Sequence, residues 1–590
     1  MIESAGRPAD GGVAQTPGLS AARPWLASYD PGVPAEVEIP EITVDGLLRR
    51  AAEAFPGRVA MDFFGQRTSY AELDRLVDAF AGLVRRAGLG QGDTVSLHLP
   101  TSPAFVIAFL GTLRAGCAAV AMSPLYVERE LAGLMGQTRP RLSVTLDVLM
   151  PRVVAARAGL GDSLRPPQGL AAIIATGIQD SLPVPLRWLY PVQQRREGRW
   201  HPVPHRPETP NLFRLLAAAP TERVDSPARP ADPAVLQGTG GTTGVPKEAV
   251  LTHRNLVANA VQCTAVLAGS SDEATSVLCA LPYFHIYGLT VAMNFALALG
   301  ATQVLLPKFD VDQVLAAIDR HRPRYFPGVP TFYAALNEHP GIGRHDLRSI
   351  EACISGAAPL PPPVQAQFES LTGGRLCEGY GLTEASPVTH VNPVHGRGKP
   401  GTIGLPLPGT DARLVDLATG ADVAGPDQVG ELWVRGPQVM AGYHERPDET
   451  ERVLRDGWLH TGDLATVDAD GYFAIVDRIK DLIIVSGANV YPREVEEVLI
   501  THPAVAEAAV IAMKSARKGE VPKAYVVLKP GATATVEDLH DFCDTNLAHY
   551  KRPAVIEIRA SLPRSMVGKV LRRELIAESE AHDAPGAPGG

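Results

Sequence analysis

The clearest chemical signal in the sequence is a stretch rich in glycine and threonine. It reads LQGTGGTTGVPKEAV over residues 236–250, with four glycines and three threonines ahead of Pro246 and Lys247. Glycine lets backbone N–H groups turn toward an anion, threonine hydroxyls donate further hydrogen bonds, and a lysine adds a positive charge. This combination predicts a loop that holds a polyphosphate. The residues expected to contact the phosphates are Thr239, Gly240, Gly241, Thr242, Thr243, Gly244 and Lys247.

This loop differs from the pattern of P-loop kinases and GTPases. In that pattern Gly-Lys is followed by Ser or Thr at the start of a helix, whereas here Lys247 lies between Pro246 and Glu248. A P-loop phosphotransferase is therefore disfavoured.

Composition and charge exclude several classes of function. The chain has 590 residues, of which 45% are hydrophobic and 20% are charged, as in ordinary soluble globular proteins. It carries 55 Lys and Arg against 64 Asp and Glu, a net charge of −9, so no overall positive field would hold a nucleic acid. We therefore expect no nucleic-acid partner.

The sequence carries no signature of secretion or of a membrane span. Residues 1–30 include Glu3, Arg7 and Asp10 and lack the continuous apolar stretch of a signal peptide. The longest apolar run, residues 104–122, is interrupted by Arg114. These features predict a cytoplasmic protein, and peripheral contact with a membrane stays open.

Alternating helix and strand patterns predict an α/β fold that must position the phosphate loop. Ser69 and Glu72 form a capping-box pattern, and apolar residues follow at helical spacing as far as a terminating Gly88. Apolar, β-rich segments at 94–99 and 117–122 continue the alternation. We expect a large domain built on mixed and parallel sheets, mainly parallel and buried, with helices packed on them.

Composition marks three further segments. Residues 1–34 and 579–590 are rich in Gly, Ala and Pro and are predicted to be flexible tails. Residues 181–232 lose regular periodicity and are predicted to form an irregular insertion. This insertion is either an ordinary loop or a basic, tryptophan-bearing patch that contacts a membrane or a partner.

A small α+β unit is expected over residues 479–578. A boundary is suggested after Asp477, and Pro492 stands at the first position of the next helix. The later elements expected in this unit are strands at 507–512, 523–528 and 555–559 and a helix over 536–549.

Eight further segments, with the phosphate loop, resemble the adenylate-forming acyl-CoA synthetases. The segments are ALPYFHIYGLT (280–290), PGVPTFYAAL (327–336), SGAAPL (355–360), EGYGLTEASPV (378–388), GELWVRGPQVMAGYHERPDET (430–450), GWLHTGDLA (457–465), VDRIKDLIIVSGANVYPREVEEVL (476–499) and LPRSMVGKVLRREL (562–575). They follow the family's order over most of residues 45–578. Within the family, the loop and the segment 181–232 look most like bacterial long-chain fatty acyl-CoA ligases.

The resemblance implies a two-step reaction. A carboxylate attacks the α-phosphorus of ATP and expels pyrophosphate, and the acyl-adenylate then reacts with the thiol of CoA. ATP, Mg²⁺ and CoA are the implied cofactor and co-substrates, and a long-chain fatty acid is the leading substrate. The implied fold is an AMP-binding domain over residues 35–478 and a mobile C-terminal domain over 479–578 that carries the catalytic lysine. A homodimer stays open.

By similarity, four residues are assigned to catalysis. Lys569 would reach from the small domain to the attacking carboxylate and the α-phosphate. Glu384 would hold Mg²⁺ against the phosphates, and the Thr383 hydroxyl would donate to the α-phosphate region. His285 matches the family position between the acyl site and the pantetheine route.

The resemblance also assigns the contacts of the nucleoside. Tyr380, between Gly379 and Gly381, would offer a flat face to adenine. Asp463 would accept hydrogen bonds from both ribose hydroxyls, with Arg478 as a donor near the same sugar. Room for the base is left by Gly356, Ala357 and Ala358.

Two residues are assigned to domain motion and to CoA. Lys480 matches the hinge about which the small domain swings, and Gly487 and its loop would help to form the route of the CoA thiol. A catalytic lysine so far along the chain from the phosphate loop requires a domain that closes and reopens.

One position departs from the family pattern. The loop commonly continues Pro-Lys-Gly, but Glu248 follows Lys247 here and places an acid beside the phosphate site. We expect Glu248 to point away from the phosphates and nucleotide binding to survive.

Several alternatives stay open. The acid could be aryl or dicarboxylic, and the acyl group could pass to a carrier protein instead of CoA, although the hinge motif runs on without the insertion typical of such ligases. A noncatalytic ligand-binding relative would be expected to have lost Lys569 or Glu384, and both are present. The pocket expected for the acyl chain draws on Tyr287, Gly288, Phe326, Val329 and Thr331, which do not reveal a chain length.

Overall fold

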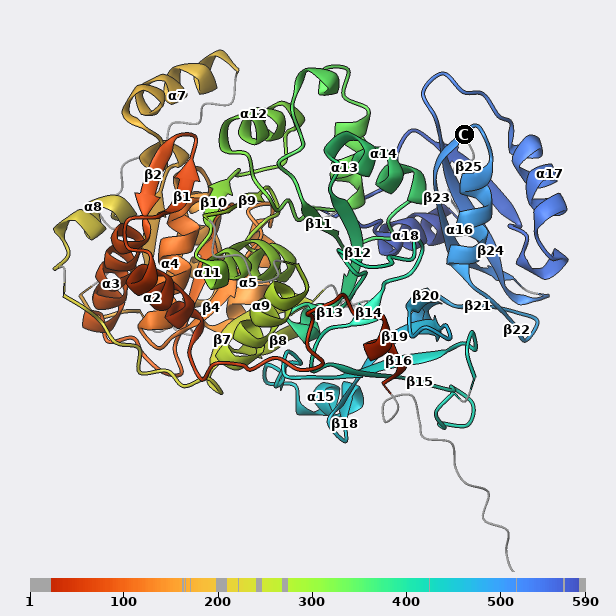
Figure 1. Ribbon diagram of the computed structural model, residues 1–590, viewed down its shortest axis with the longest axis horizontal. Coiled ribbons are helices and arrows are strands. Elements are labelled where there is room, and N and C mark those ends of the chain that lie inside the picture. The colour runs from red at the N-terminus through yellow and green to blue at the C-terminus, as the bar shows by residue number, and fades with distance from the viewer. Residues whose placement is uncertain are drawn as a thin grey trace, which may run out of the picture.

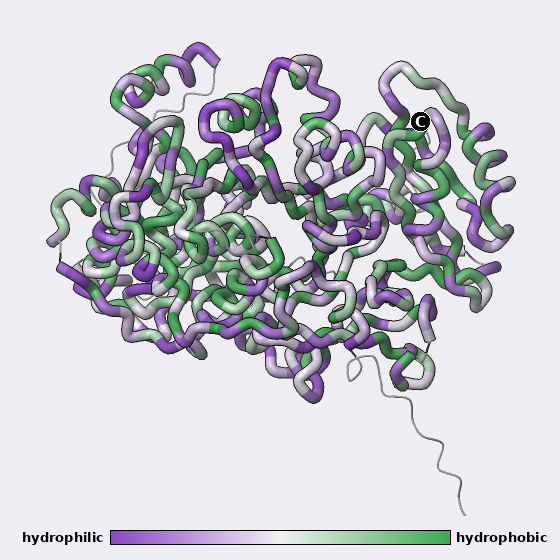
Figure 2. Tube along the Cα trace, in the orientation of Figure 1, coloured by the Kyte–Doolittle hydropathy of each residue, from purple (hydrophilic) through white to green (hydrophobic). Residues whose placement is uncertain are grey.

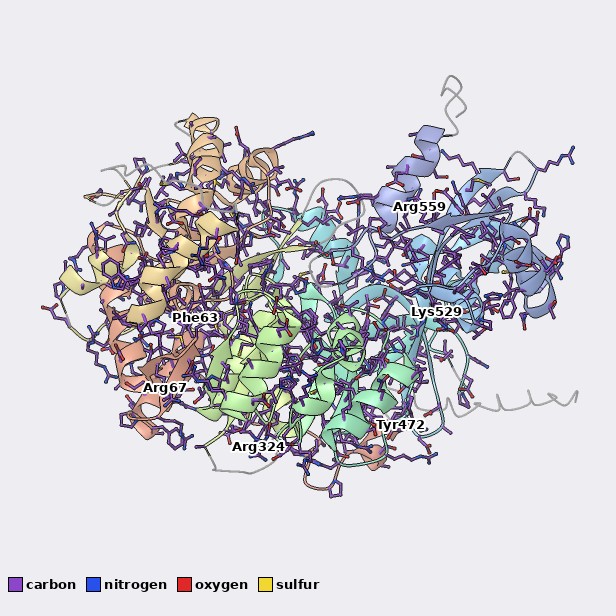
Figure 3. The ribbon with its side chains drawn as sticks, turned by 90° about the horizontal axis from the view of Figure 1, so that it is seen from above. Phe63, Arg67, Arg324, Tyr472, Lys529 and Arg559 are labelled. Atoms are coloured by element: carbon purple, nitrogen blue, oxygen red, sulfur yellow. The ribbon has the colours of Figure 1, made fainter. Side chains whose placement is uncertain are left out.

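A computed structural model defines most of the chain. It describes residues 23–161, 164, 166–169, 171–197, 209–220, 222–239, 247–267, 274–423, 425–515, 517–565 and 568–582. Figure 1 shows a large body, which holds the chain as far as β20, and a smaller C-terminal unit at one end. Figure 3, seen from above, places Lys529 and Arg559 of the small unit far from Phe63 and Arg67 of the large body.

A seven-stranded sheet contains β7 and β8, the strands on either side of the predicted phosphate loop. Its order is β17-β8-β7-β4-β3-β5-β6; the strands from β7 to β6 run parallel, and β8 and β17 are antiparallel to their neighbours. The strands are β3 (Thr94–His98), β4 (Ala118–Ala121), β5 (Leu142–Leu146), β6 (Ile173–Thr176), β7 (Pro233–Thr239), β8 (Lys247–Thr252) and β17 (Gly442–Tyr443). The expected parallel sheet is therefore present, with an antiparallel edge at the loop.

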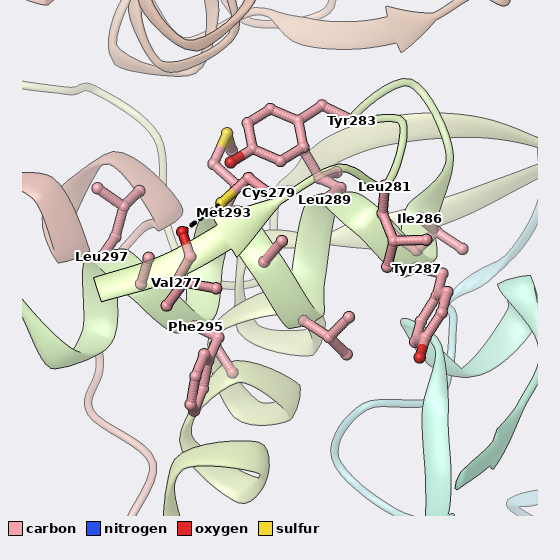
Figure 4. Close-up of a cluster of buried hydrophobic side chains, with 14 of the residues drawn as sticks. Val277, Cys279, Leu281, Tyr283, Ile286, Tyr287, Leu289, Met293, Phe295 and Leu297 are labelled. Carbon is pink, nitrogen blue, oxygen red and sulfur yellow. Dashed lines mark hydrogen bonds between the residues drawn. The ribbon is translucent and has the colours of Figure 1, made fainter. Parts of the chain in front are cut away.

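Two four-stranded sheets complete the centre of the large body. Their orders are β2-β1-β10-β9 and β11-β12-β13-β14, and Tyr325 bridges β9 to β11. The strands are β1 (Val59–Phe63), β2 (Gln66–Ser69), β9 (Ser276–Cys279), β10 (Thr302–Leu305), β11 (Ala352–Ser355), β12 (Arg375–Gly381), β13 (Val388–Val391) and β14 (Leu405–Pro406). The close-up in Figure 4 shows apolar side chains from β9 and the segment after it, including Tyr283 and Tyr287, packed in the core.

An antiparallel sheet leads toward the small unit. Its order is β15-β16-β19-β18, with β20 also paired to β19. The strands are β15 (Asp411–Val415), β16 (Gly430–Arg435), β18 (Leu454–Arg455), β19 (Trp458–Val467) and β20 (Phe473–Arg478).

Helices cover these sheets. Helix α3 begins as predicted, because the Ser69 side chain accepts a hydrogen bond from the Glu72 amide, and its apolar stripe, including Phe80, is buried. The helices of the large body are α2 (Val44–Ala54), α3 (Tyr70–Arg86), α4 (Pro103–Arg114), α5 (Glu128–Thr138), α6 (Met150–Ala158), α7 (Val184–Arg196), α8 (Leu212–Ala218), α9 (His253–Leu267), α10 (Ile286–Gly288), α11 (Phe295–Leu299), α12 (Val311–His321), α13 (Pro330–Asn337), α14 (Pro362–Thr372) and α15 (Pro447–Val453). Short turns are η1 (Pro24–Ser28), η2 (Asp147–Leu149), η4 (Ile178–Ser181), η6 (Ile342–Arg344), η7 (Thr383–Ala385) and the π-helical η5 (Leu289–Asn294).

The small unit has its own sheet and core. Its order is β22-β21-β24-β23, with β25 paired to β24, and its main apolar cluster is separate from that of the large body. Its elements are η8 (Ile479–Asp481), β21 (Ile483–Val485), β22 (Ala488–Val490), α16 (Pro492–Thr501), β23 (Val505–Ser515), β24 (Gly519–Leu528), α17 (Val536–Asn546), η9 (His549–Lys551), β25 (Val555–Arg559) and α18 (Arg572–His582). The helix opened by Pro492 and the strand at 555–559 are confirmed.

Three sequence-based expectations need correction. The predicted tail 1–34 is structured from residue 23, because η1 buries Trp25 against Phe473, with ring centroids 6.1 Å apart. The tail predicted from residue 579 overlaps α18, which buries Ser579. The insertion 181–232, expected to be irregular, forms α7 and α8, whereas residues 198–208 and 221 lie outside the described part.

Figure 2 shows apolar residues throughout the interior of both units. Among the described residues, no helix is both long enough and apolar enough to cross a lipid bilayer.

Candidate active site

Three of the predicted nucleoside residues meet where strands of two different sheets come together. Asp463 on β19 faces Arg478 on β20 across an antiparallel pair, and Arg478 Nε lies 3.2 Å from Asp463 Oδ1. The hydroxyl of Tyr380, near the end of β12, donates to Asp463 Oδ2. Because Asp463 is almost fully buried, these contacts fix its carboxylate in one orientation.

Lys569 lies within this group although it belongs to the small unit. A Cβ atom on the preceding Gly568 would lie 3.0 Å from Thr331 Oγ1 of the large body, so the backbone at Gly568 lies close to the Thr331 side chain. Burial, and then the positive charges of Arg478 and Lys480, lower the pKa of Lys569 to about 7, while Asp463 and Asp481 oppose this shift. The Lys569 ammonium is thus held among like charges.

Lys480 shares the same electrostatic environment. Burial and the charge of Arg478 lower its pKa, and the carboxylates of Asp481, Asp463 and Glu384 act in the opposite direction. Lys480 lies in η8, where the chain passes from the large body to the small unit. Residues predicted from four separate motifs therefore occupy one region.

His285 adjoins the Lys569 ammonium. Burial, and then the charge of Lys569, lower the pKa of His285 to about 4, so this imidazole is neutral near neutral pH. Its Nδ1 accepts a hydrogen bond from the Tyr287 amide at 3.2 Å. The Tyr287 hydroxyl in turn donates to the carbonyl oxygen of Ile354 at 2.8 Å, which ties this segment to β11.

Glu384 and Lys247 are connected through residues of the segment 430–450. Tyr443 donates its hydroxyl hydrogen to Glu384 Oε1 at 2.7 Å, and Lys247 Nζ lies 2.7 Å from Glu449 Oε2. Lys247 Nζ also lies 5.4 Å from the centre of the Tyr443 ring. Strand β17 pairs with β8 and so brings Tyr443 beside the phosphate loop.

Tyr443 and Glu449 were not among the residues predicted for the site. The signal that could have identified them is the quoted motif GYHERPDET, in which a tyrosine and several acids follow a glycine. Their partners depend on which strands pair, and the motif does not show this.

Glu248 and Lys247 are consecutive residues of β8, so their side chains lie on opposite faces of the strand. Glu248 has only 2% of its surface exposed, and a Cβ atom on Gly238 would lie 3.4 Å from its Oε2. Neither carboxylate oxygen has a hydrogen-bond partner among the described residues, and burial raises the pKa of Glu248 to about 7. The Glu248 carboxylate therefore does not compete with a phosphate for Lys247.

Small residues at the ends of β11 and β12 allow close backbone approach. A Cβ atom on Gly356 would lie 2.9 Å from the Tyr287 ring, and one on Gly381 would lie 2.0 Å from the carbonyl oxygen of Pro387. Ala357, which follows Gly356, is exposed and has a φ of 69°. Ala358 is the next residue. On β12, a Cβ atom on Gly379 would lie 2.8 Å from Ile354 Cγ2.

The residues predicted for the phosphate loop and for the CoA route are not brought into this group. Thr239 ends β7 opposite Lys247, but Gly240, Gly241, Thr242, Thr243 and Gly244 lie outside the described residues. Gly487 sits in the exposed turn between β21 and β22, with a φ of 86°. Thr383 and Glu384 open η7, directly after β12.

The donor set at Glu384 fits one kind of metal site. Within the described part of the chain, no group of three or more His, Cys, Asp or Glu side chains could hold an ion alone. Mg²⁺ commonly binds one or two carboxylates together with substrate phosphates and water. A single partly buried carboxylate beside a predicted phosphate loop matches that arrangement.

Known proteins that resemble this chain include adenylate-forming enzymes. A family model described as AMP-binding enzyme matches residues 48–444, and one described as AMP-binding enzyme C-terminal domain matches residues 494–569. A long-chain-fatty-acid–CoA ligase of Bacillus subtilis (strain 168) is 42% identical over 568 residues, which cover 95% of this chain and 99% of the relative.

Two solved structures resemble the whole chain. ATP-bound MatB from Rhodopseudomonas palustris has a TM-score of 0.79 and 29% identity, covering 92% of this chain and 100% of its own. The anthranilate CoA ligase AuaEII in complex with anthranoyl-AMP has a TM-score of 0.80 and 25% identity, covering 93% of this chain and 99% of its own.

Proposed function

Because the chain belongs to the AMP-binding enzyme family, we propose that it is an ATP-dependent ligase that joins a fatty acid to CoA. The acid is activated as an acyl-adenylate and then transferred to the CoA thiol, giving acyl-CoA, AMP and pyrophosphate. The observation that carries this proposal is the position of Lys569 among Arg478, Asp463 and Lys480. The name of the Bacillus relative supports a long-chain acid.

The nucleoside is proposed to bind where three side chains converge. The Asp463 carboxylate would accept hydrogen bonds from the ribose hydroxyls, and the Arg478 guanidinium beside it would be a further donor near the sugar. Tyr380 would present its ring to adenine, since its hydroxyl is already committed to Asp463. The base would lie beside the exposed Ala357, because the Tyr287 ring already fills the space at Gly356.

The phosphates are proposed to lie along the antiparallel edge of the seven-stranded sheet. Thr239 and Lys247 face each other at the ends of β7 and β8, so both can reach an anion held by the loop between them. The Glu449 carboxylate would have to give up Lys247 when the phosphates arrive.

Mg²⁺ would be held by Glu384 together with phosphate oxygens. When bound, the ion would neutralise phosphate charge that otherwise repels the attacking carboxylate. Tyr443 would orient Glu384 by its hydrogen bond to Oε1 and leave Oε2 for the metal.

Lys569 is proposed to act in the first step. The attacking carboxylate and the α-phosphate are both anionic, and a buried ammonium group between them offsets their repulsion. His285 would stay neutral beside it and so would not add a second full charge. Thr331 contacts Gly568 and would hold the lysine loop against the large body.

The second step is proposed to use a different orientation of the small unit. Gly487 is exposed and has no place in the cluster around Lys569, so the small unit would rotate about Lys480 to bring that turn to the CoA route. Rotation would break the hydrogen bonds from Arg493 to the Asp477 side chain and to the Ile475 carbonyl, each 2.8 Å long.

The test is pyrophosphate release from the full-length protein with ATP, Mg²⁺ and a panel of acids, with and without CoA. The panel should include short and long fatty acids, an aryl acid and a dicarboxylic acid. Rapid release with a long-chain acid and formation of its CoA thioester are expected. Transfer only to a phosphopantetheine carrier protein would favour the alternative ligase, and no release with any acid would contradict the proposal.

We propose a cytoplasmic enzyme that meets its lipid substrate at a membrane surface. A homodimer stays a prediction that light scattering would test.

A further inference from the structure

Helix α7 carries the densest group of exposed apolar side chains among the described residues. Its members are Val184, Leu186, Trp188, Leu189 and Val192, and the four of them other than Leu186 are called the α7 apolar face. Trp188 is 75% exposed, more than any other large apolar side chain described. Exposed apolar residues elsewhere are more scattered along the chain, as is normal for a soluble surface.

The helix presents its apolar side outward. Val184, Trp188, Leu189 and Val192 stand at positions i, i+4, i+5 and i+8, which share one face of a helix. Tyr190 and Gln194 lie on the other side and are only half exposed, with Tyr190 packed against the main core. This is the reverse of an ordinary surface helix, whose apolar side faces the core.

The helix is anchored on the inner side. Arg187 Nη2 lies 3.7 Å from Asp180 Oδ1 in η4. Asp180 is itself held by the Asn211 side chain at 2.7 Å and by the Gly177 amide at 2.8 Å. Figure 1 shows α7 at the outer edge of the large body, at the end opposite the small unit. The outer face is therefore accessible.

The charge of α7 indicates what kind of partner the helix suits. Residues 184–197 include Arg187, Arg195 and Arg196 against the single acid Glu197, whereas the whole chain has a net charge of −9. A helix with exposed Trp and Leu and with arginines beside them suits the interface of a bilayer, where apolar groups enter the acyl region and arginines meet lipid phosphates. Two copies of this face would instead bring like charges together.

We propose that α7 docks the protein on bilayers that contain anionic lipid, with the α7 apolar face inserted at the headgroup level. The identity of the partner rests on the proposed function, since a long-chain fatty acid partitions into such bilayers. Docking itself requires no reaction and can be measured alone.

The test is co-sedimentation of the full-length protein with vesicles. One set contains phosphatidylglycerol mixed with phosphatidylcholine, and the other contains phosphatidylcholine alone. Binding to the anionic vesicles is expected, weakened by added salt. Replacing both Arg195 and Arg196 by Gln should lower the partition coefficient about fivefold for each arginine removed.

The double variant Trp188→Ser, Leu189→Ser should lower binding by about tenfold or more, because two apolar side chains no longer enter the bilayer. Leu417→Ser is the matched control, since Leu417 is 52% exposed but lies far along the chain in the β15–β16 connection. All variants should release pyrophosphate with a soluble short-chain acid at the wild-type rate in buffer without vesicles.

Equal vesicle binding by wild type and the Trp188→Ser, Leu189→Ser variant would overturn the inference, as would no binding to either vesicle. Self-association that the same variant abolishes, without vesicle binding, would assign the face to a second copy of the chain and also overturn it. Loss of pyrophosphate release with intact docking would instead count against the proposed function alone.

Discussion

The two lysines proposed to meet the nucleotide differ in what surrounds them. Lys247 starts β8 and is already paired with Glu449, 2.7 Å away, beside the ring of Tyr443. Lys569 has no side-chain hydrogen bond or ion pair in the described part of the protein and lies near two other cations, Arg478 and Lys480. The positive charge of Lys247 in the large body is therefore already balanced by a carboxylate, whereas the positive charge of Lys569 in the small unit is not.

This difference has a chemical consequence. An arriving anion stabilises Lys569, which lies among other cations, more than it stabilises Lys247, which must first give up its ion pair with a carboxylate. The nucleotide would thus stabilise the small unit in its present position through Lys569, while Lys247 would mainly exchange one anionic partner for another. The following variants test that contrast.

The largest effect is expected for Lys569→Ala. It should lower adenylation by roughly two to four orders of magnitude, because the charge between two anions is removed. Thiolysis of supplied acyl-adenylate should be much less affected, since the small unit is proposed to rotate for that step. Both rates are measured with the purified variant, as pyrophosphate release and as thioester formation.

Lys514→Ala is the matched control for this variant. Lys514 also belongs to the small unit, but its side chain is 92% exposed, and both steps should keep the wild-type rate. Equal loss of both steps in Lys569→Ala would mean that the lysine supports the fold of the site instead of the first step.

A smaller effect is expected for Lys247→Ala. The KM for ATP should rise roughly 10- to 100-fold with a smaller change in kcat, because one charged hydrogen bond to a phosphate is lost. Glu449→Gln should change the KM by less than about fivefold, since a partly exposed ion pair contributes little. A kcat loss in Lys247→Ala as large as that in Lys569→Ala would remove the contrast between the two lysines.

The smallest effect on activity is expected for Glu248→Gln, next to Lys247 but on the other face of β8. The pKa of Glu248 in the folded protein, about 7, is above the ordinary 4.5 of a glutamate, so the folded protein binds the proton more tightly. Stability from this group is therefore present at low pH and is lost as the pH rises through about 4.5 to 7. The free energy of unfolding of the variant should be about 3 kcal/mol higher than that of the wild type near pH 8, and the two should differ little near pH 4.

Thermal unfolding of both proteins across this pH range measures the effect, and pyrophosphate release should stay within about twofold of wild type. A difference in Tm that does not change with pH would show that Glu248 is not buried without a partner.

Local elements were predictable where one short stretch of sequence specifies them. The capping pair Ser69 and Glu72 predicts the start of α3, and the strand at 555–559 matches β25, because both signals lie within a few residues of the element. Helix α7 was missed for a physical reason. Its apolar side faces outward and Pro191 lies inside it, so it lacks the usual signs of a helix packed on a core.

The individual residues of the site could be predicted from sequence motifs, but the contacts between them could not. Motifs supplied Asp463, Arg478 and Lys569, but the approach of Gly568 to Thr331 joins residues far apart in the sequence. The partnership of Lys247 with Glu449 likewise depends on the pairing of β8 with β17. Sequence spacing carries no information on which distant strands become neighbours.

The central claim is that Lys569 is a poorly stabilised cation that the nucleotide stabilises. Its pKa can be measured by NMR after reductive methylation of lysines with carbon-13 formaldehyde, with the signal assigned by its absence in Lys569→Arg. The account predicts a pKa of about 7 without nucleotide and a clearly higher value with a non-hydrolysable ATP analogue and Mg²⁺. A pKa near the ordinary 10.5 that does not respond to the analogue would contradict it.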